Sequence, residues 1–146
     1  MPLPTYNVST AKSHLARLRR SAITDWKESI IENSKENQSE LVSLIATVVI
    51  DDLTSFCKFT HNWVKEEEDT VWTLISPEID VFGIGETKEE AINSLIDTAL
   101  EYSELFFESP ALYMSAAVNR RQHYGFLRRI ARCEGDREKI RTVLGL

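Results

Sequence analysis

The chain has 146 residues, of which 42% are hydrophobic and 27% are charged, and its formal net charge is -6. This composition is that of an ordinary soluble globular protein, and the length suits one domain or two small ones. No apolar run approaches the roughly 20 residues of a membrane-spanning helix, and the N-terminus lacks the apolar core of a signal peptide. We therefore expect a cytoplasmic protein that does not bind a membrane.

The charges fall into three blocks along the chain. Residues 1–27 hold five basic groups and one acidic group, residues 28–109 hold four basic and nineteen acidic groups, and residues 110–146 hold eight basic and three acidic groups. Such blocks either neutralise one another within the fold or present different faces to different partners.

A short strand followed by a helix is predicted at the N-terminus. The stretch "TYNVS" alternates in polarity and ends at Ser9 and Thr10, which are both good N-cap residues. The following residues repeat at spacings of four, three and four, which predicts a helix with one narrow apolar stripe. The stripe consists of Ala11, Leu15, Leu18 and Ala22.

The rest of this helix is expected to be cationic, because the first 24 residues contain no carboxylate. Its basic residues are Lys12, Arg17, Arg19 and Arg20. Lys and Arg side chains bind phosphates, and a helix N-terminus adds backbone donors, so these residues and Thr10 are candidates for DNA binding. The alternatives are a solvated face or a face that neutralises acidic neighbours within the fold.

An antiparallel strand pair is predicted next. The apolar, β-branched segments "SIIEN" and "LVSLIATVVI" flank "SKENQ", which has the composition of a turn. A helix is an alternative for residues 41–50, because periodicity does not decide short apolar runs. Asp51 or Asp52 is expected to cap a short helix through "LTSFCKF". The charged segment "HNWVKEEEDT" is expected to be exposed and to separate a domain of residues 1–62 from one of residues 63–146.

Two strands and a long helix are predicted in the second half. The strands cover about residues 70–76 and 79–84, and a tight connection containing Pro77 joins them. Thr87 and Glu90 form a T-x-x-E capping box, which predicts a helix to about residue 107. After Pro110 the chain is predicted to be helical to its end, with a break at Gly135.

One stripe of the predicted long helix is acidic and contains no cation. It consists of Glu90, Ser94, Asp97, Glu101, Glu104 and Glu108. Like charges at these spacings are mutually unfavourable, so the stripe needs a cationic partner or full solvation. The partner could be internal, namely Arg121, Arg128 and Arg132 on one stripe of a later helix. It could instead be a basic protein, which makes Asp97, Glu101, Glu104 and Glu108 candidates for partner binding.

The sequence does not predict an enzyme. His14, His61 and His123 lie in unrelated contexts, without a metal-binding spacing, a phosphate loop or a nucleophile elbow. Glu78 and Asp80 are two residues apart on a predicted strand and could suggest a metal site, but a solvent-facing strand end explains them as well. We expect no catalysis, cofactor or metal.

Three stretches of the chain resemble antitoxin families. The N-terminal "NVSTAKSHLARL" resembles the opening of Phd/YefM-type antitoxins, in which a strand leads into a V-S-x-x-x-A-x-x-x-L helix. The stretch "SPEIDVFGIGETKEEAINSL" resembles the HicB-type antitoxin module, in which a strand pair leads through G-x-T-x-e-E-A into a helix. The tail "NRRQHYGF" is similar to the Asn-Arg-x-x-His-x-x-Tyr/Phe ending of Phd-like antitoxins paired with RelE-type toxins.

The resemblance implies an α+β antitoxin of a type II toxin–antitoxin system. Its expected fold is a small Phd-like sheet with helices, then an antiparallel strand pair with a long helix and a helical C-terminal region. Its expected partners are a cognate RelE-type toxin, operator DNA and a second copy of the chain, which together allow toxin inhibition and repression of the operon. The alternative is a non-enzymatic protein- or ligand-binding module that does not bind DNA.

Overall fold

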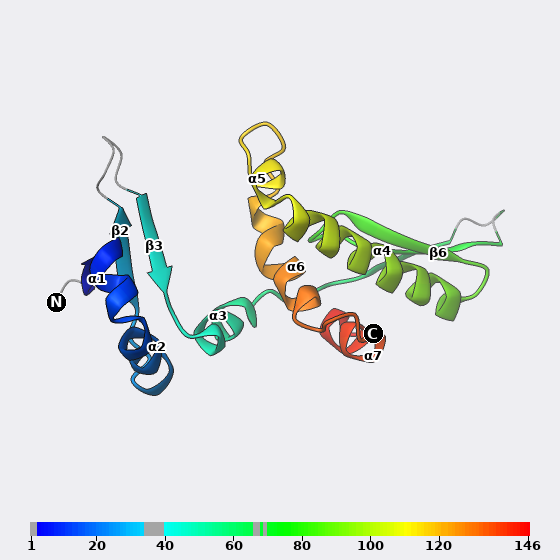
Figure 1. The fold of residues 1–146 in the computed structure, drawn as a ribbon. Coiled ribbons are helices and arrows are strands. Elements are labelled where there is room, and N and C mark those ends of the chain that lie inside the picture. Colours follow the sequence, from blue (N-terminus) through cyan, green and yellow to red (C-terminus); the bar gives the residue numbers. More distant parts are fainter. Residues whose placement is uncertain (1–2, 34–39, 66–67, 69) are drawn as a thin grey trace. The chain divides into compact units, whose positions relative to one another are not determined.

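A computed structural model describes residues 3–33, 40–65, 68 and 70–146, and the predicted α+β class is confirmed (Figure 1). The chain divides into two compact units, residues 1–53 and residues 54–146, which we call the N-terminal and the C-terminal unit. Each unit contains a three-stranded sheet. None of the helices within the described ranges is both long and apolar enough to span a bilayer.

The N-terminal unit has a mixed sheet. Strand β1 (Thr5–Asn7) pairs in parallel with β2 (Ser29–Asn33), which pairs antiparallel with β3 (Glu40–Leu44). The helices α1 (Val8–Ser13) and α2 (Leu15–Thr24) connect β1 to β2, as a parallel crossover requires. The predicted strand "SIIEN" is therefore present, whereas its predicted turn "SKENQ" lies outside the described residues.

The first helix differs from the prediction at both ends. It begins at Val8, so Ser9 and Thr10 are not its N-cap; Asn7 is, because its side-chain Oδ1 accepts a hydrogen bond of 2.8 Å from the Thr10 backbone N–H. It also stops at His14, whose backbone leaves the helical region with φ of -111° and ψ of 12°. One predicted helix is therefore two short ones.

The apolar run at residues 41–50 changes conformation halfway. It forms β3 only as far as Leu44, and α3 (Thr47–Thr54) then begins. The expectation of a strand to residue 50 was wrong, and so was that of a helix through residues 53–59 capped by Asp51 or Asp52. Both residues lie inside α3. The run is too short for its periodicity to mark the change.

The C-terminal unit contains an antiparallel sheet covered by a long helix. Its strands are β4 (Asn62–Val64), β5 (Trp72–Ser76) and β6 (Val81–Gly85), in that spatial order. Helix α4 (Lys88–Glu108) packs on one face of this sheet (Figure 1). The predicted strand pair and helix are confirmed, whereas β4 was missed because three exposed residues in a charged segment carry no clear alternation.

Two features of the sequence place α4 on the sheet. The predicted capping box is present: the Thr87 hydroxyl accepts from the Glu90 N–H at 3.2 Å, and the Glu90 carboxylate accepts from the Thr87 N–H at 3.2 Å. At Gly83, a Cβ would overlap the backbone of Ala91 and Leu95. Glycine therefore allows the helix to approach β6 closely.

The chain after Pro110 is helical, but with an interruption. Pro110 is at N1 of α5 (Pro110–Tyr113), as predicted. Residues 114–120 are not helical, contrary to the expectation. The 3₁₀ helix η1 (Arg121–His123), α6 (Tyr124–Ala131) and α7 (Arg137–Leu144) follow. The predicted break between the last two helices is present, with Gly135 at a φ of 79°.

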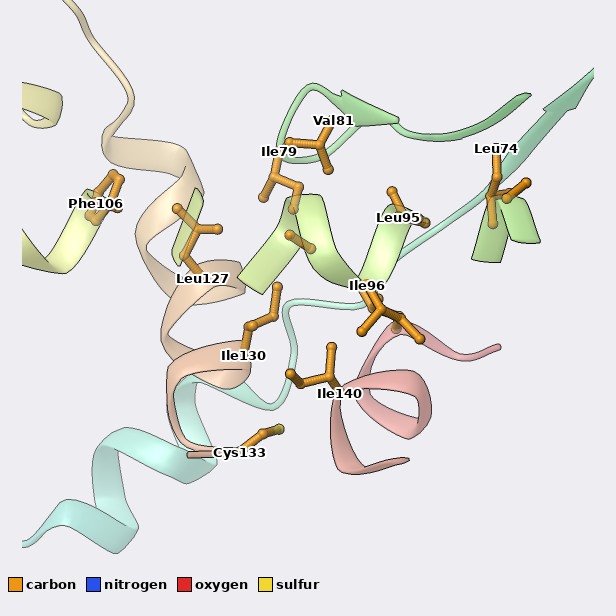
Figure 2. Close-up of a cluster of buried hydrophobic side chains, with 13 residues drawn as sticks. Leu74, Ile79, Val81, Leu95, Ile96, Phe106, Leu127, Ile130, Cys133 and Ile140 are labelled. Atoms are coloured by element: carbon orange, nitrogen blue, oxygen red, sulfur yellow. The ribbon is translucent and has the colours of Figure 1, made fainter. Parts of the chain in front are cut away.

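The core of the C-terminal unit lies between the sheet, α4 and the last two helices (Figure 2). Its buried side chains are those of Leu74, Ile79, Val81, Ala91, Leu95, Ile96, Ala99, Phe106, Leu127, Ile130, Cys133, Ile140 and Leu144. Burying a Leu, Ile, Val or Phe side chain contributes about 1.5 to 3 kcal/mol, so this cluster stabilises the packing of α4 and the last two helices on the sheet.

Candidate functional site

The first candidate site is the basic surface of the N-terminal helices. Lys12 on α1 and Arg17, Arg19 and Arg20 on α2 are all exposed, and we call them the basic helix surface. None of them forms an ion pair with a described acidic residue. Four cations that no described carboxylate neutralises can contact a polyanion.

The apolar stripe predicted for these helices is confirmed in part. Ala11, Leu18 and Ala22 of the apolar stripe are buried. Leu15, also assigned to the stripe, is exposed, because the helix restarts at this residue after the interruption at His14. Thr10 lies inside α1, and its backbone N–H donates to Asn7 rather than being open to a ligand.

The N-terminal unit has little apolar core of its own. Its buried apolar side chains are those of Ala11, Leu18, Ala22 and Ala46. On the edge strand β3, Leu41 is 62% exposed and Val42 is 63% exposed, although successive strand residues point to opposite faces. Both faces of this edge strand are therefore open.

A groove of about 880 Å³ also opens on this unit. Apolar side chains from β1, from α2 and from α3 line it, together with Arg17 and Lys27. The apolar lining includes Leu3, Tyr6, Leu18, Trp26, Ile45 and Val49. The groove is therefore apolar over much of its lining, with charged side chains among its walls.

The second candidate site is the acidic stripe of α4. Asp97 forms an ion pair with Arg137 of α7, whereas Glu101, Glu104 and Glu108 are exposed. In the first turn of α4, next to the stripe, Glu89 accepts a bidentate pair of hydrogen bonds from Arg141 at 2.5 and 3.0 Å. These bonds hold the pKa of Glu89 below its ordinary value.

The stripe has an internal ion pair, but the arginine is not one of the three that we considered, because Asp97 pairs with Arg137. Arg121, Arg128 and Arg132 were considered as one helical stripe, but Arg121 lies in η1 and Arg128 in α6. Arg121 is in η1 and donates from Nε to the Met114 carbonyl, while Arg128 is in α6 and donates to the Thr54 hydroxyl at 3.4 Å. The observed partners come from α7, since that helix rather than α6 lies beside the first half of α4.

A polar cluster ties the non-helical segment to the sheet. Asp80 forms an ion pair with Arg120, and the Nε2 atom of the buried His123 lies 3.9 Å from the Asp80 carboxylate. His123 Nδ1 and the Tyr102 hydroxyl are 2.7 Å apart. Burial lowers the pKa of His123 and raises the pKa of Tyr102. These contacts join the segment around Arg120 and His123 to α4 and to the turn between β5 and β6.

The two carboxylates next to Pro77, Glu78 and Asp80, both have protein partners. Glu78 and Asp80 lie in the turn between β5 and β6, not on a strand as expected. The Glu78 Oε1 atom accepts from the Thr60 backbone N–H at 2.8 Å, and Asp80 is paired with Arg120. In the part of the chain that the structure describes, no group of three or more His, Cys, Asp and Glu residues could hold a metal ion.

The described residues thus present a basic surface on the N-terminal helices and an acidic stripe on α4, within an α+β fold. A family model described as PHD_like, antitoxin of toxin–antitoxin systems of the RelE/RelB kind, matches residues 1–145. The chain belongs to this family of antitoxins.

A solved structure has a similar fold. It is a crystal structure, at 1.80 Å resolution, described as an antitoxin part of a proposed toxin/antitoxin system from Syntrophomonas wolfei subsp. wolfei. The TM-score is 0.74 with 20% sequence identity, and the alignment covers 97% of this chain and 96% of the other. None of the curated proteins matches this chain in sequence.

Proposed function

We propose that this antitoxin neutralises its cognate RelE-type toxin by direct binding and represses its own operon by binding operator DNA as a homodimer. The family assignment supports the toxin partner. The basic helix surface is the observation that carries the DNA half of the proposal, because these cations are exposed in an otherwise acidic chain.

DNA binding would rest on phosphate contacts from Lys12, Arg17, Arg19 and Arg20. Each neutralised phosphate releases condensed counterions, so affinity should fall steeply as the salt concentration rises. Thr10 would contribute its hydroxyl, since its backbone N–H donates to Asn7. These contacts position a protein on DNA without reading its sequence.

Dimerisation would involve the N-terminal unit. Its open groove and the exposed Leu41 and Val42 are apolar surfaces that a second copy could cover. A dimer would present two basic helix surfaces related by a two-fold axis, and would therefore favour a palindromic operator.

Toxin binding would use the acidic part of the chain. Glu101, Glu104 and Glu108 are exposed on α4 and could face a basic ribonuclease. Asp97 already pairs with Arg137, so a basic residue of the toxin would have to compete with Arg137 for it. Complementary charge mainly speeds association and selects the partner.

The test is an anisotropy titration of the full chain against its own upstream DNA at two salt concentrations, with the double variant Arg19→Glu/Arg20→Glu. We expect tight binding by the wild type that weakens with salt and is lost in the variant. The matched control is Arg137→Glu, a charge reversal in the C-terminal unit that should keep DNA binding. Equal binding by the wild type and the double variant would refute the basic helix surface as the phosphate contact.

A second candidate function is a protein-binding module without DNA binding, favoured by the net charge of -6. This alternative would be established if the wild-type protein does not bind the DNA at either salt concentration, yet protects cells against the co-expressed toxin.

A further inference from the structure

Trp26 has an unusual backbone conformation for a tryptophan. It follows Asp25, the C-cap residue of α2, and its φ is 56°. The position after a helix C-cap adopts this left-handed conformation most easily as glycine, and a bulky side chain there is strained. Among the non-glycine residues of positive φ in the described ranges, Trp26 alone is aromatic. The chain therefore carries strain at a residue where glycine would avoid it.

Contacts within the fold do not offset this strain. Trp26 is 59% exposed, and its indole N–H has no hydrogen-bond partner among the described residues. The hydrogen bond that closes the backbone here runs from the Lys27 N–H to the Ser21 carbonyl at 3.3 Å and does not involve the indole. A strained residue that gains so little from the folded chain is a candidate for a binding function.

The surroundings of Trp26 are cationic. It lines the groove of the N-terminal unit together with Arg17 and Lys27, which are both exposed and form no ion pair with a described carboxylate. Arg20 is one helical turn beyond Arg17 and lies on the same side of α2. We call Arg17, Arg20, Trp26 and Lys27 the groove rim. Because Arg17 and Arg20 also belong to the basic helix surface, the rim continues that surface.

Two carboxylates lie near the rim but do not outnumber its three cations. Glu28 lines the groove and accepts a hydrogen bond of 2.6 Å from the Ser43 hydroxyl. Asp25 is exposed at the end of α2 and is not part of the groove lining. A basic toxin would meet an excess of positive charge at this place, whereas a polyanion would be attracted to it. Charge complementarity and continuity with the basic helix surface therefore favour DNA as the occupant.

We propose that the groove rim contacts the DNA backbone, with the Trp26 ring against a sugar and its indole N–H donating to a phosphate oxygen. An indole combines an apolar body with one hydrogen-bond donor, as such a contact requires. The inference rests on the DNA half of the proposed function and adds a neutral residue to it. It assigns the rim to DNA and leaves Leu41 and Val42 of β3 to a second copy.

The experiment is an anisotropy titration of the full chain against its upstream DNA over a series of salt concentrations. Trp26→Gly should weaken binding about tenfold at every salt concentration, because a neutral ring releases no counterion. Trp26→Phe keeps a ring and should lose less affinity. Lys27→Ala should instead lower the slope of log affinity against log salt concentration by about one. The matched control is Phe56→Ala, which removes a residue that is 82% exposed outside the N-terminal unit and should change binding less than about threefold.

Thermal melts of the free chain separate a DNA contact from a packing role. Trp26→Gly should leave the melting temperature unchanged or raise it, because glycine adopts a positive φ without strain. A lower melting temperature would show that the ring packs within the fold and would overturn the inference. So would a lower mass of the free chain by light scattering, which would assign the ring to a second copy.

The DNA titration itself separates this inference from the proposed function. Wild-type binding that Trp26→Gly retains within about threefold would overturn the inference and leave the proposed function intact. Failure of the wild type to bind the DNA would refute the DNA half of the proposed function.

Discussion

The two units of this antitoxin differ in how much of their packing they supply themselves. The C-terminal unit buries a continuous cluster that includes Leu95, Phe106 and Ile130, whereas among the described residues of the N-terminal unit three of the four buried apolar ones are alanines. A small unit with so little buried surface gains little hydrophobic stabilisation. The comparison indicates that hydrophobic burial stabilises the C-terminal unit more than it stabilises the N-terminal unit.

The largest effect should come from emptying the C-terminal core. Phe106→Ala removes a fully buried ring and should lower the free energy of unfolding by about 3 to 5 kcal/mol. Urea denaturation followed by circular dichroism measures this loss. Leu41→Ala, which truncates an exposed side chain of β3, should change the stability of the isolated chain by less than about 0.5 kcal/mol. Equal losses of unfolding free energy in the two variants would contradict the difference in hydrophobic burial between the units.

A smaller loss is expected where α4 approaches the sheet. Gly83→Ala places a methyl group against the backbone of Ala91 and Leu95 and should cost about 1 to 3 kcal/mol. Gly135→Ala is the control, since no atom lies within 4 Å of a Cβ there and only the φ of 79° opposes alanine, at a cost of about 1 kcal/mol. Thermal melts that rank Gly135→Ala as the more damaging would show that the close approach is not important for stability.

Dilution should affect the two units differently. If a second copy completes the N-terminal unit, each tenfold dilution reduces the stability that the dimer supplies by about 1.4 kcal/mol. Hydrogen exchange of the α1 and α2 amides should then accelerate as the protein is diluted, while that of the α4 amides stays constant. Concentration-independent exchange in both units would remove the case for a dimer through the N-terminal unit.

The smallest effect is a pH dependence that belongs to the C-terminal unit. Burial and the nearby Arg120 guanidinium lower the pKa of His123 below 6.5, and the Asp80 carboxylate acts in the opposite direction. The Tyr102 hydroxyl is the hydrogen-bond partner of His123. Well above pH 6.5 the histidine is neutral in both states and contributes no pH dependence. Below it the unfolded chain binds the proton more readily, so stability falls with decreasing pH, by at most about 1.4 kcal/mol per unit.

Unfolding titrations at pH 7.5 and 5.5 measure this dependence. His123→Gln should flatten it, whereas His14→Gln, at an exposed residue of the N-terminal unit, should leave it unchanged. A dependence that survives in His123→Gln would place the titrating group elsewhere.

Local signals predicted the C-terminal unit better than the N-terminal one. The Thr87 and Glu90 capping box, Pro110 at a first helical position and Gly135 at a break each act through neighbouring residues, and each was recognised. The N-cap at Asn7 was missed because Ser9 and Thr10 have the same intrinsic ability to cap. The strand β4 was missed because its pairing with β5 is not visible in three residues.

The strand pair and long helix of the second half, the basic character of the first helices and the acidic stripe followed from the sequence alone, because propensity, capping and charge are properties of short segments. Which cation meets which carboxylate depends on the tertiary structure, since the partner of Asp97 is set by how α7 packs on α4. It also decided that Phe82 and Ile84 face away from the helix. A strand's alternation separates two faces, but only packing determines which of them is covered.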